Sequence, residues 1–573
     1  MRNGEIAQVF QDIADLLELK GENPFKIRAY QRAARSIDHL PVEVKRLAEE
    51  DRLREIPGVG EAITGKITEL ITTGRLEYYE KLKAEFPEGI STLFEVPGIG
   101  PKTARLLSQE MGISSIDELE KAILSGQVAS LPRLGEKSAA NILRHIQALR
   151  RKDRRIPLGK ALPVVDEISA RLREVPGLKN LTPAGSLRRR KETVGDIDLM
   201  GTADDAREVI EAFTTMPQVE EVLASGTTKA SAVFSGGLQV DLRIVEHVSF
   251  GSTLQYFTGN KQHNINLRER ARRRGLSLSE YGITSLATGE LLRFATEEAF
   301  YQRLGLQFIP PEIRQGQDEI ERAEKGTIPR LVEPADIKGD LHVHSDWSDG
   351  HDSIAALALA AKALGYEYLA ITDHSSGRGI AHGLDMARLK QQIAQIKELN
   401  KKIGGITILS GIEVDIRAGG RLDLPDEVLA EVDIVNAAVH SGMNQPQEQM
   451  TRRIIKAMEN PHVDMLAHPT CRLLPSREPV AADMEAIFQA AISTGTILEI
   501  NSMPNRLDLK DIHAYRAREL GVKLAISTDA HSTGQLGLMR FGLGMARRGW
   551  CQAQDILNTQ PLDEIMAYLK PAE

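Results

Sequence analysis

Seven short apolar segments in the C-terminal part of the chain each carry a polar or metal-ligating residue at or near their end. Stretches with helical periodicity separate them. Continuous apolar strands that alternate with helices indicate parallel βα units, in which both faces of the sheet are buried. In a barrel of such units the carboxyl ends of the strands build the site. The sequence therefore predicts an α/β barrel with its site at one rim. The seven segments are residues 340–345, 368–374, 406–416, 433–440, 463–469, 496–502 and 522–531.

Histidine and carboxylate side chains concentrate at these predicted strand ends, most densely in KGDLHVHSDWSDG at residues 338–350. A single histidine at a strand end is more often a hydrogen-bonding residue than a metal ligand. Many such groups at one rim would leave charges and dipoles unsatisfied without cations. Imidazole and carboxylate ligands together suit Zn²⁺, Mn²⁺ or Fe²⁺ better than Ca²⁺ or Mg²⁺, and a bridging carboxylate such as Glu413 would allow two or three ions. The nine candidate ligands are His342, His344, Asp349, His374, Glu413, His440, His468, Asp529 and His531.

The length of 573 residues exceeds what one hydrophobic core usually supports, so it predicts two or more domains. No long apolar run suggests a membrane span, and the N-terminus lacks the apolar region of a signal peptide. The two cysteines exclude a disulfide framework and favour a reducing cytoplasm. The net charge of -8 argues against a uniformly basic nucleic-acid binder. Three basic clusters, at residues 150–155, 188–191 and 268–274, nevertheless favour phosphate contacts.

A glycine-turn pattern recurs in the N-terminal region, where Gly and Pro separate short helical stretches. REIPGVGEAITGKI at residues 54–67 is repeated as FEVPGIGPKTARLL at 94–107 and more weakly as LPRLGEKSAANIL at 131–143. Each turn would present backbone N–H groups at a helix N-terminus, which suits a phosphate oxygen. The units resemble helix-hairpin-helix elements, which hold DNA through its backbone. The alternative is an ordinary tight helical hairpin. The predicted DNA contacts are Gly58, Gly60, Gly98, Gly100 and Lys102.

Three aspartates stand out in the region between residues 156 and 315, where the pattern becomes mixed α and β. Asp196 and Asp198 lie two positions apart on a predicted strand, so both carboxylates face one side. A second short strand, GLQVDLRIV, places Asp241 among apolar neighbours, where a carboxylate without a partner would be costly. Three carboxylates on adjacent strands can hold two divalent ions, Mg²⁺ or Mn²⁺. Such ions activate an attacking oxygen and stabilise a leaving pyrophosphate.

Gly-Ser followed by Asp-x-Asp is the nucleotidyltransferase pattern, and YFTGNKQHNINLRERARRRGLSLSEYGI at residues 256–283 resembles the nucleotide-binding segment of family X DNA polymerases. The similarity extends from the N-terminus to about residue 300 and includes the helical hairpins. It implies that the three aspartates are the catalytic metal ligands. The nucleotide-binding residues that it implies are Ser186 and Arg189 at the triphosphate, Tyr256 and Phe257 at the sugar, Asn264 at the base, and Gly185 and Gly259 without a further assigned role.

Several positions depart from polymerase beta, the familiar member of that family. Gln239 replaces a basic residue beside the third carboxylate, and Lys261 stands where an acidic residue meets the nascent base pair. Lys66 falls where the family's lyase domain places its Schiff-base lysine, but Ala62 and Phe25 replace supporting residues there. Two alternatives remain for Lys66: a lyase nucleophile that forms an imine with an abasic sugar, or a contact to a backbone phosphate.

The part of the chain from Lys338 to the C-terminus resembles the PHP (polymerase and histidinol phosphatase) family of phosphoesterases. His-x-His, TDH, GIEVD, AHP and STDAH occur in that family's order, and each matched ligand position is filled. The resemblance implies hydrolysis of phosphate esters at a cluster of two or three ions, Zn²⁺ or Mn²⁺. Asn501 and Arg506 would either contact the substrate phosphate or stabilise a loop, and His351 has no assigned role.

Together these features predict a multidomain chain with a helical N-terminal region, an α+β nucleotidyltransferase palm and a C-terminal α/β distorted seven-stranded (β/α) barrel. The expected domains are residues 1–90, a lyase-like helical DNA-binding domain with a helix-hairpin-helix; 91–155, a second such helical domain; 156–246, the palm; 247–315, a nucleotide-binding subdomain; 316–337, a linker; and 338–573, the PHP domain.

The predicted function is a DNA polymerase that fills short gaps in repair, joined to a metal-dependent 3′-5′ exonuclease or 3′-end-processing site. A 3′-phosphatase and an abasic-site endonuclease are further candidate activities of that site. The alternatives are a DNA-end-binding scaffold with weak polymerase activity and a barrel that is structural or hydrolyses a small phosphate ester. The expected partners are gapped or primer-template DNA with its 3′ ends and dNTPs. We expect a cytoplasmic monomer without membrane contact.

Overall fold

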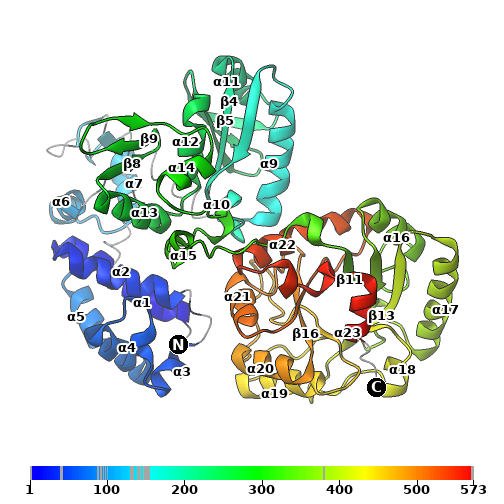
Figure 1. Cartoon of the computed structure of the whole chain (residues 1–573). Helices are drawn as coiled ribbons and strands as arrows, with labels where there is room; N and C mark the ends of the chain where they lie inside the picture. The colour runs from blue at the N-terminus through cyan, green and yellow to red at the C-terminus, as the bar shows by residue number, and fades with distance from the viewer. Residues whose placement is uncertain are drawn as a thin grey trace. The chain divides into compact units, whose positions relative to one another are not determined.

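The computed structural model describes residues 3–38, 40, 43–86, 90, 93, 96, 99, 101–128, 134–136, 138–139, 142–143, 146, 155–377 and 381–569. The chain divides into two compact units, Met1–Arg154 and Arg155–Glu573 (Figure 1). Among the helices of the described residues, none has the length and apolar character needed to cross a membrane.

The N-terminal unit is built from short helices in its described residues. Helices α1 and α2 pack together through Phe10 and Tyr30, whose ring centroids lie 6.0 Å apart. The helices are α1 (Asn3–Lys20), α2 (Pro24–Asp38), α3 (Val44–Glu49), α4 (Glu61–Thr73), α5 (Glu77–Ala84), α6 (Pro101–Met111) and α7 (Ile116–Leu124).

The first predicted glycine turn joins a short 3-10 helix, η1 (Leu53–Glu55), to α4. Gly60 is the N-cap of α4. Gly58 has φ +88°, and a Cβ there would lie 2.6 Å from Cγ of Arg32, so the turn requires glycine on both grounds. Gly98, Gly100 and part of the third repeat lie outside the described residues, whereas Lys102 belongs to α6.

A five-stranded sheet in the order β2-β4-β7-β6-β5 forms the palm of the second unit. Along β7, buried residues alternate with half-buried ones, which leaves Asp241 on the face away from the core. The palm elements are β1 (Ile156–Pro157), α9 (Leu158–Leu172), β2 (Leu178–Pro183), α10 (Gly185–Arg188), β3 (Thr193–Val194), β4 (Ile197–Ala203), α11 (Ala206–Thr214), β5 (Val219–Ser225), β6 (Lys229–Phe234) and β7 (Leu238–Ile244).

A smaller subdomain follows the palm and combines helices with a three-stranded antiparallel sheet in the order β10-β9-β8. Its core contains Leu267, Phe300 and Ile309. Its elements are α12 (Phe250–Thr258), α13 (Lys261–Arg273), β8 (Leu276–Ser279), β9 (Gly282–Ser285), β10 (Leu291–Leu292), α14 (Glu297–Arg303) and η5 (Pro311–Ile313).

Residues 316–337, which the sequence predicts to be a linker, instead contain α15 (Glu319–Lys325) and a 3-10 turn, η6 (Pro334–Asp336). The helix is amphipathic. Ile320 and Ala323 are buried in the same cluster as Trp550, whereas Glu321 and Lys325 form an exposed ion pair. The charged residues that suggested a linker therefore cover only the outer face of a packed segment.

The C-terminal part is a barrel of seven parallel strands in sequential order, β11 to β17, as the sequence predicts (Figure 1). Val343 bridges Ala530 in parallel, which brings the first and last strands together. The strands are β11 (Gly339–Val343), β12 (Tyr368–Ile371), β13 (Thr407–Asp415), β14 (Ile434–Ala438), β15 (Met465–Leu466), β16 (Ile497–Asn501) and β17 (Leu524–Ser527).

Helices follow the strands and contribute to a layer outside the sheet. Alternate strand residues belong to two different apolar clusters: Tyr368 lies in a cluster with Ile565 of α23, and Leu369 lies in the cluster that includes the other helices. The helices are α16 (Ile354–Ala363), α17 (Met386–Lys402), α18 (Asp426–Leu429), α19 (Gln447–Met458), α20 (Met484–Thr494), α21 (Asp511–Glu519), α22 (Met539–Arg548) and α23 (Leu562–Leu569).

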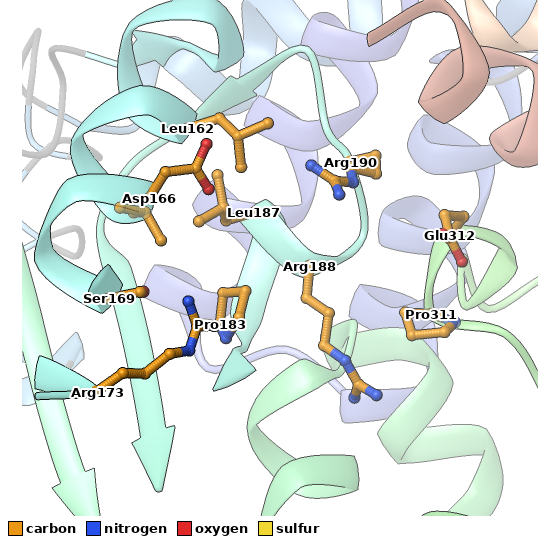
Figure 2. Close-up of a pocket in the computed structure, with 11 residues that line it drawn as sticks. Leu162, Asp166, Ser169, Arg173, Pro183, Leu187, Arg188, Arg190, Pro311 and Glu312 are labelled. Carbon is orange, nitrogen blue, oxygen red and sulfur yellow. The ribbon is translucent and has the colours of Figure 1, made fainter. Parts of the chain in front are cut away.

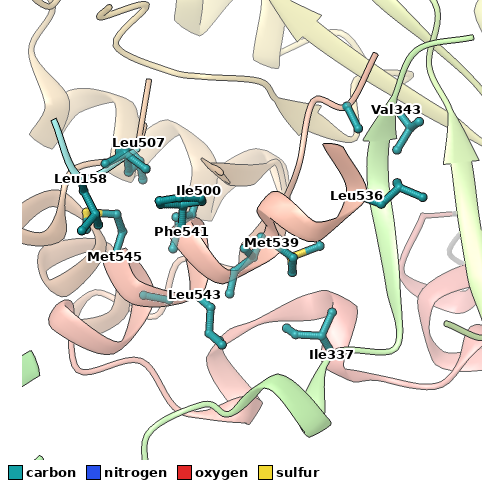
Figure 3. Close-up of a cluster of buried hydrophobic side chains, with 14 of the residues drawn as sticks. Leu158, Ile337, Val343, Ile500, Leu507, Leu536, Met539, Phe541, Leu543 and Met545 are labelled. Atoms are coloured by element: carbon teal, nitrogen blue, oxygen red, sulfur yellow. The ribbon is translucent and has the colours of Figure 1, made fainter. Parts of the chain in front are cut away.

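The palm and the barrel share one hydrophobic core. Leu158 of the palm lies beside Met545 of α22 and Leu507 (Figure 3). A Cβ on Gly159 would lie 2.1 Å from Cβ of Pro504, so the two parts approach each other at backbone distance. This continuous packing explains why residues 155–573 form one compact unit.

Candidate active sites

The nine candidate ligands of the barrel come together at the carboxyl ends of its strands. His342 lies within β11 and Glu413 within β13. The other seven lie in the loops that follow strands: His344 and Asp349 after β11, His374 after β12, His440 after β14, His468 after β15, and Asp529 and His531 after β17.

Eight of these residues form three overlapping groups, and within each group all donor atoms lie within 4.8 Å of one another. His344 and His374 each belong to two groups. The Nε2 atoms of His344 and His342 lie 3.1 Å apart. The groups are His344, Asp349, His374 and His531; His342, His344 and Asp529; and His374, Glu413 and His440.

Glu413 occupies the centre of this arrangement. Its Oε2 lies 2.6 Å from Nδ1 of His374, and its Oε1 lies 3.2 Å from Nε2 of His440 and 2.9 Å from Nε2 of His468. Its side chain is only 1% exposed. A buried carboxylate that faces several imidazoles from different strands can bridge cations. The contact with Glu413 also connects His468, the ninth candidate ligand, to the three groups.

The donor set fits a metal cluster. Within the described residues, Nδ1 of His344 and Nδ1 of His468 are buried and make no hydrogen bond. Buried polar atoms without a partner are costly in a protein interior, and a cation would satisfy several of them at once. Imidazole and carboxylate donors are the ligands of zinc and related divalent ions.

The electrostatics divide the histidines of the cluster into two sets. Facing carboxylates overcome burial and raise the pKa of His342, His374, His440 and His531, whereas the other two histidines are held neutral. Burial, with the neighbouring His374 and His531, lowers the pKa of His344 to about 3. Burial and the nearby Arg506 lower the pKa of His468 to about 4. Burial alone would raise the pKa of Asp349, but hydrogen bonds with His374 and His531 hold it well below its ordinary value. Neutral imidazoles beside ionised carboxylates are the forms that ligate cations.

Glu499 in β16 supports the cluster from outside, and the sequence interpretation missed it. Its Oε1 lies 2.8 Å from Nδ1 of His342, and its Oε2 accepts the backbone N–H of His468 at 2.6 Å. Carboxylates in this position orient ligating imidazoles. The available signal was a charged residue in the middle of the apolar segment TILEINS.

Asn501 and Arg506 both reach the ligand Asp529. The side-chain amide of Asn501 donates to Oδ2 of Asp529 and to Oε2 of Glu499, each at 3.1 Å. Nε of Arg506 lies 3.4 Å from the same aspartate oxygen. His351, for which the sequence gives no role, is exposed and donates its backbone N–H to the carbonyl of His531 at 2.8 Å.

The second candidate site lies on the palm sheet. Asp198 of β4 and Asp241 of β7 are register partners on adjacent parallel strands, and Asp196 directly precedes β4. Gly185 has φ +59°, and a Cβ there would lie 2.7 Å from Oδ2 of Asp198. Glycine therefore lets the start of α10 approach the carboxylate. Nε2 of Gln239 donates to Oδ1 of Asp241 at 3.2 Å, so this departure from the polymerase beta pattern holds the third aspartate in place.

The predicted nucleotide-binding residues lie in or directly after three helices, α10, α12 and α13. Arg189, the C-cap of α10, donates through Nη1 to the carbonyl of Thr258 at the end of α12. Tyr256 and Phe257 are half-buried neighbours on α12, with ring centroids 5.3 Å apart. The side chain of Asn264 donates to the carbonyl of Tyr256 at 2.7 Å.

Ser186 and Gly259 complete this set. Ser186 lies in α10, and its carbonyl accepts the N–H of Lys191 at 3.0 Å. Gly259 has φ +62°, and a Cβ there would lie 3.4 Å from Nη1 of Arg189, which is close enough to crowd that guanidinium. Lys261 begins α13 and is exposed.

A buried ion network, not foreseen from the sequence, ties α10 to the following subdomain. Oε2 and Oε1 of Glu297 each lie 2.6 Å from an arginine nitrogen, of Arg188 and Arg314 respectively. Burial alone would raise the pKa of Glu297, but Arg314 and Arg188 lower it to about 2. The three partners lie far apart in the sequence, so no local pattern indicated them.

Lys66 lies on α4 of the N-terminal unit and is half-buried. Its Nζ lies 4.8 Å from the centroid of the Tyr78 ring and donates to the carbonyl of Ala62 at 3.3 Å. Phe25 is 78% exposed at the start of α2. The aromatic face attracts an ammonium ion.

Four family models match consecutive parts of the chain. A helix-hairpin-helix domain matches residues 1–76, and a SAM-like helix-hairpin-helix tandem matches residues 90–148. The DNA polymerase beta thumb matches residues 253–315, and the PHP domain matches residues 340–503.

Three relatives match either the whole chain or one part of it. A DNA polymerase/3'-5' exonuclease PolX of Bacillus subtilis (strain 168) is 40% identical over 572 residues, which is 100% of both chains. A probable phosphatase of Thermoanaerobacter sp. (strain X514) is 32% identical over 244 residues, 40% of this chain and 94% of its own. DNA polymerase lambda of Arabidopsis thaliana is 25% identical over 347 residues, 54% of this chain and 62% of its own.

Proposed function

The chain belongs to the family X DNA polymerases that carry a C-terminal PHP domain, and from this membership we propose that it fills short DNA gaps during base-excision or break repair while its barrel site trims 3′ ends. Its substrates would be dNTPs and gapped or primer-template DNA. The relative from Bacillus subtilis is named for both activities and matches the whole chain.

The observation that carries this proposal is that one compact unit holds two separate groups of candidate ligands, one of aspartates and one of histidines and carboxylates. One is the Asp198 and Asp241 pair on the palm, with Asp196 beside it. The other is the nine-ligand cluster of the barrel. A scaffold that only binds DNA ends would have no need for either set of candidate ligands.

In the palm, two Mg²⁺ or Mn²⁺ ions bound to the aspartates would activate the attacking 3′ oxygen and stabilise the departing pyrophosphate. The protein's own residues position the nucleotide. Ser186 and Arg189 bind the triphosphate, Tyr256 and Phe257 border the sugar, and Asn264 faces the base. A Tyr-Phe pair against the sugar excludes a 2′-hydroxyl by steric contact.

In the barrel, two or three Zn²⁺ or Mn²⁺ ions held by the nine ligands would supply the nucleophile and neutralise phosphoryl oxygens. Glu499 and Asn501 fix the ligands His342 and Asp529 in position. Arg506 supplies a fixed positive charge beside the cluster for a phosphate oxygen. A 3′-terminal phosphodiester, a 3′-phosphate and an abasic-site phosphate are all compatible with this chemistry.

We also propose that Lys66 contacts a DNA phosphate rather than acting as a lyase nucleophile. Nζ of Lys66 lies over the Tyr78 ring and donates to the carbonyl of Ala62, and Ala62 and Phe25 stand where the family has residues that support an imine-forming lysine. We also propose that the chain is cytoplasmic, because its two cysteines, Cys471 and Cys551, are buried and form no disulfide, which suits a reducing compartment. We propose that it is a monomer, because a single chain holds both candidate sites.

A labelled primer annealed to leave a short gap tests this function, with Mn²⁺ present and with or without dNTPs. We expect extension with dNTPs and shortening without them. Asp198→Ala should abolish extension and retain shortening, and His344→Ala should do the reverse. If the primer grows but never shortens, the barrel acts on another phosphate ester; if it shortens but never grows, the polymerase proposal is wrong.

A further inference from the structure

Residues 189–192 connect α10, which carries the proposed triphosphate contacts, to β3. Arg190 has φ +53°, a left-handed conformation that is unfavourable for a residue with a side chain. The turn is closed by the N–H of Lys191, which donates to the carbonyl of Ser186 at 3.0 Å. A strained turn keeps its conformation only where surrounding contacts determine it.

The palm itself leaves one side of this turn open. A cavity of about 250 Å³ is lined by Leu187 and Arg190 together with Leu162 and Asp166 of α9, and Glu312 lines it from the other side (Figure 2). An unfilled space provides no packing contacts that would hold a backbone in place. Contacts from outside the palm therefore add to those that the palm makes, such as the N–H of Leu158 that donates to the carbonyl of Glu192 at 2.8 Å.

Helix α22 of the barrel provides the first of these contacts. The Arg548 side chain is 2% exposed, and its Nη1 donates to the carbonyl of Arg189 at 2.8 Å. Its Nη2 binds Asp511, so the guanidinium is fixed on the barrel side. A Cβ on Gly544 would lie 3.1 Å from Cβ of Arg190, so α22 lies directly against the strained residue.

Arg472 of the barrel provides the second contact. Its Nη1 lies 2.9 Å from Oε2 of Glu192, and its side chain is 5% exposed. Its Nε donates to the carbonyl of Arg506 at 2.9 Å. Arg506 also pairs with the candidate ligand Asp529. Arg472 therefore contacts both the nucleotide-binding turn and Arg506, a residue that supports the barrel site.

We propose that Arg548 and Arg472 are positioning residues for nucleotide binding in the palm, although both belong to the barrel. They hold the backbone of Arg189 and the carboxylate of Glu192 in place. They thereby set the direction in which the Arg189 guanidinium meets a nucleoside triphosphate. Neither residue touches the nucleotide. The inference rests on the proposed polymerase function. It adds that two side chains of the barrel set the affinity of the palm for dNTPs.

The test is single-nucleotide gap filling by the full chain as a function of dNTP concentration. The double variant R548M/D511N removes the contact together with the buried carboxylate that pairs with Arg548. We expect the KM for dNTP to rise about tenfold while kcat falls less than about threefold and the KM for gapped DNA stays within about twofold. Arg540→Gln is the matched control, because it removes an exposed α22 ion pair to Asp166 of the palm and should leave the KM for dNTP unchanged.

Melting temperatures establish that each variant is folded. If R548M/D511N does not fold, the double variant R472Q/E192Q tests the second contact with the same expected rise in KM. A folded variant whose KM for dNTP stays within about twofold of the wild type overturns the inference and leaves the polymerase function intact.

Calorimetric titration of dATP into the wild type with Mg²⁺ separates the two proposals. If the wild type neither extends a primer nor binds dATP, the polymerase function fails and the inference fails with it. If the wild type binds dATP and R548M/D511N binds it about tenfold more weakly, the inference holds whatever the rate of extension.

Discussion

Nε of Arg506 lies 3.4 Å from Oδ2 of Asp529, so a guanidinium stands at the edge of the barrel cluster. Burial alone would lower the pKa of Arg506, but Asp529 and Glu413 raise it, so the side chain remains a cation. Its exposed fraction of 15% leaves it within reach of a substrate. A planar cation beside a phosphoesterase cluster can bind a phosphoryl oxygen directly.

Replacement of Arg506 should therefore impair only the barrel reaction. We expect Arg506→Ala to slow primer shortening by about 10- to 100-fold and to change primer extension by less than about twofold. Denaturing gels of the same labelled primer, with and without dNTPs, measure both rates. An equal loss of the two rates would indicate damage to the fold instead of loss of a phosphate contact.

Glu499 should control how tightly the cluster holds its ions. It touches His342 and the backbone of His468 without belonging to the candidate ligand set. Loss of such a partner typically weakens metal affinity by about 10- to 100-fold. We expect Glu499→Gln to lose bound Zn²⁺ or Mn²⁺ during dialysis, as measured by elemental analysis. Glu431→Gln, which removes an exposed carboxylate of the same barrel, should retain the wild-type metal content.

The Glu297 network should make the second unit sensitive to acid. Glu297 has a pKa of about 2 in the folded chain against an ordinary value of 4.5, because Arg314 and Arg188 overcome the effect of burial. A lowered pKa stabilises the fold above pH 4.5 by roughly 3 kcal/mol, and this contribution is lost as the pH falls through about 2.

Urea unfolding between pH 7 and pH 2 checks this dependence. We expect Glu297→Gln to lower the free energy of unfolding at pH 7, because two buried arginines lose their partner, and to flatten its fall in acid. Tyr301 on the same helix does not titrate between pH 7 and pH 2, because burial raises its pKa above its ordinary value of 10. Glu298→Gln, an exposed neighbour on α14, should keep the wild-type profile; a similar profile in the Glu297 variant would contradict the prediction.

Local patterns in the sequence were sufficient to predict the barrel. Apolar runs that alternate with helices gave all seven strands, and the candidate ligands at their ends lie together in the structure. The palm strand that carries Asp241 was also visible, because alternation with period two survives in a half-buried strand. In both cases the information lies within about ten residues of the site.

The contacts between distant segments could not be predicted in this way. Arg472 and Glu192 lie 280 positions apart, and each is an ordinary charged residue in its own neighbourhood. The predicted linker at residues 316–337 shows the same limitation, since its charges were evident but the burial of Ile320 against other segments was not. Long-range pairing depends on how finished elements pack, which single-sequence periodicity does not contain.

Gly185 provides a test of the palm geometry, because the effect of its positive φ can be separated from the effect of its close approach to Asp198. Its φ is +59°, and a Cβ would lie 2.7 Å from Oδ2 of Asp198. Gly236 also has a positive φ, +86°, but no atom lies within 4 Å of its Cβ position. Alanine at either position should cost about 1 kcal/mol through backbone strain. Only Gly185→Ala should also displace the carboxylate of Asp198, a proposed metal ligand.

We therefore expect Gly185→Ala to reduce primer extension by at least about 100-fold, whereas Gly236→Ala retains extension within about threefold at a similar loss of stability. Shortening of the primer without dNTPs should be unchanged in both, since neither glycine belongs to the barrel. Comparable extension by the two variants would mean that Asp198 tolerates displacement. The close approach of α10 to β4 would then not be needed for catalysis.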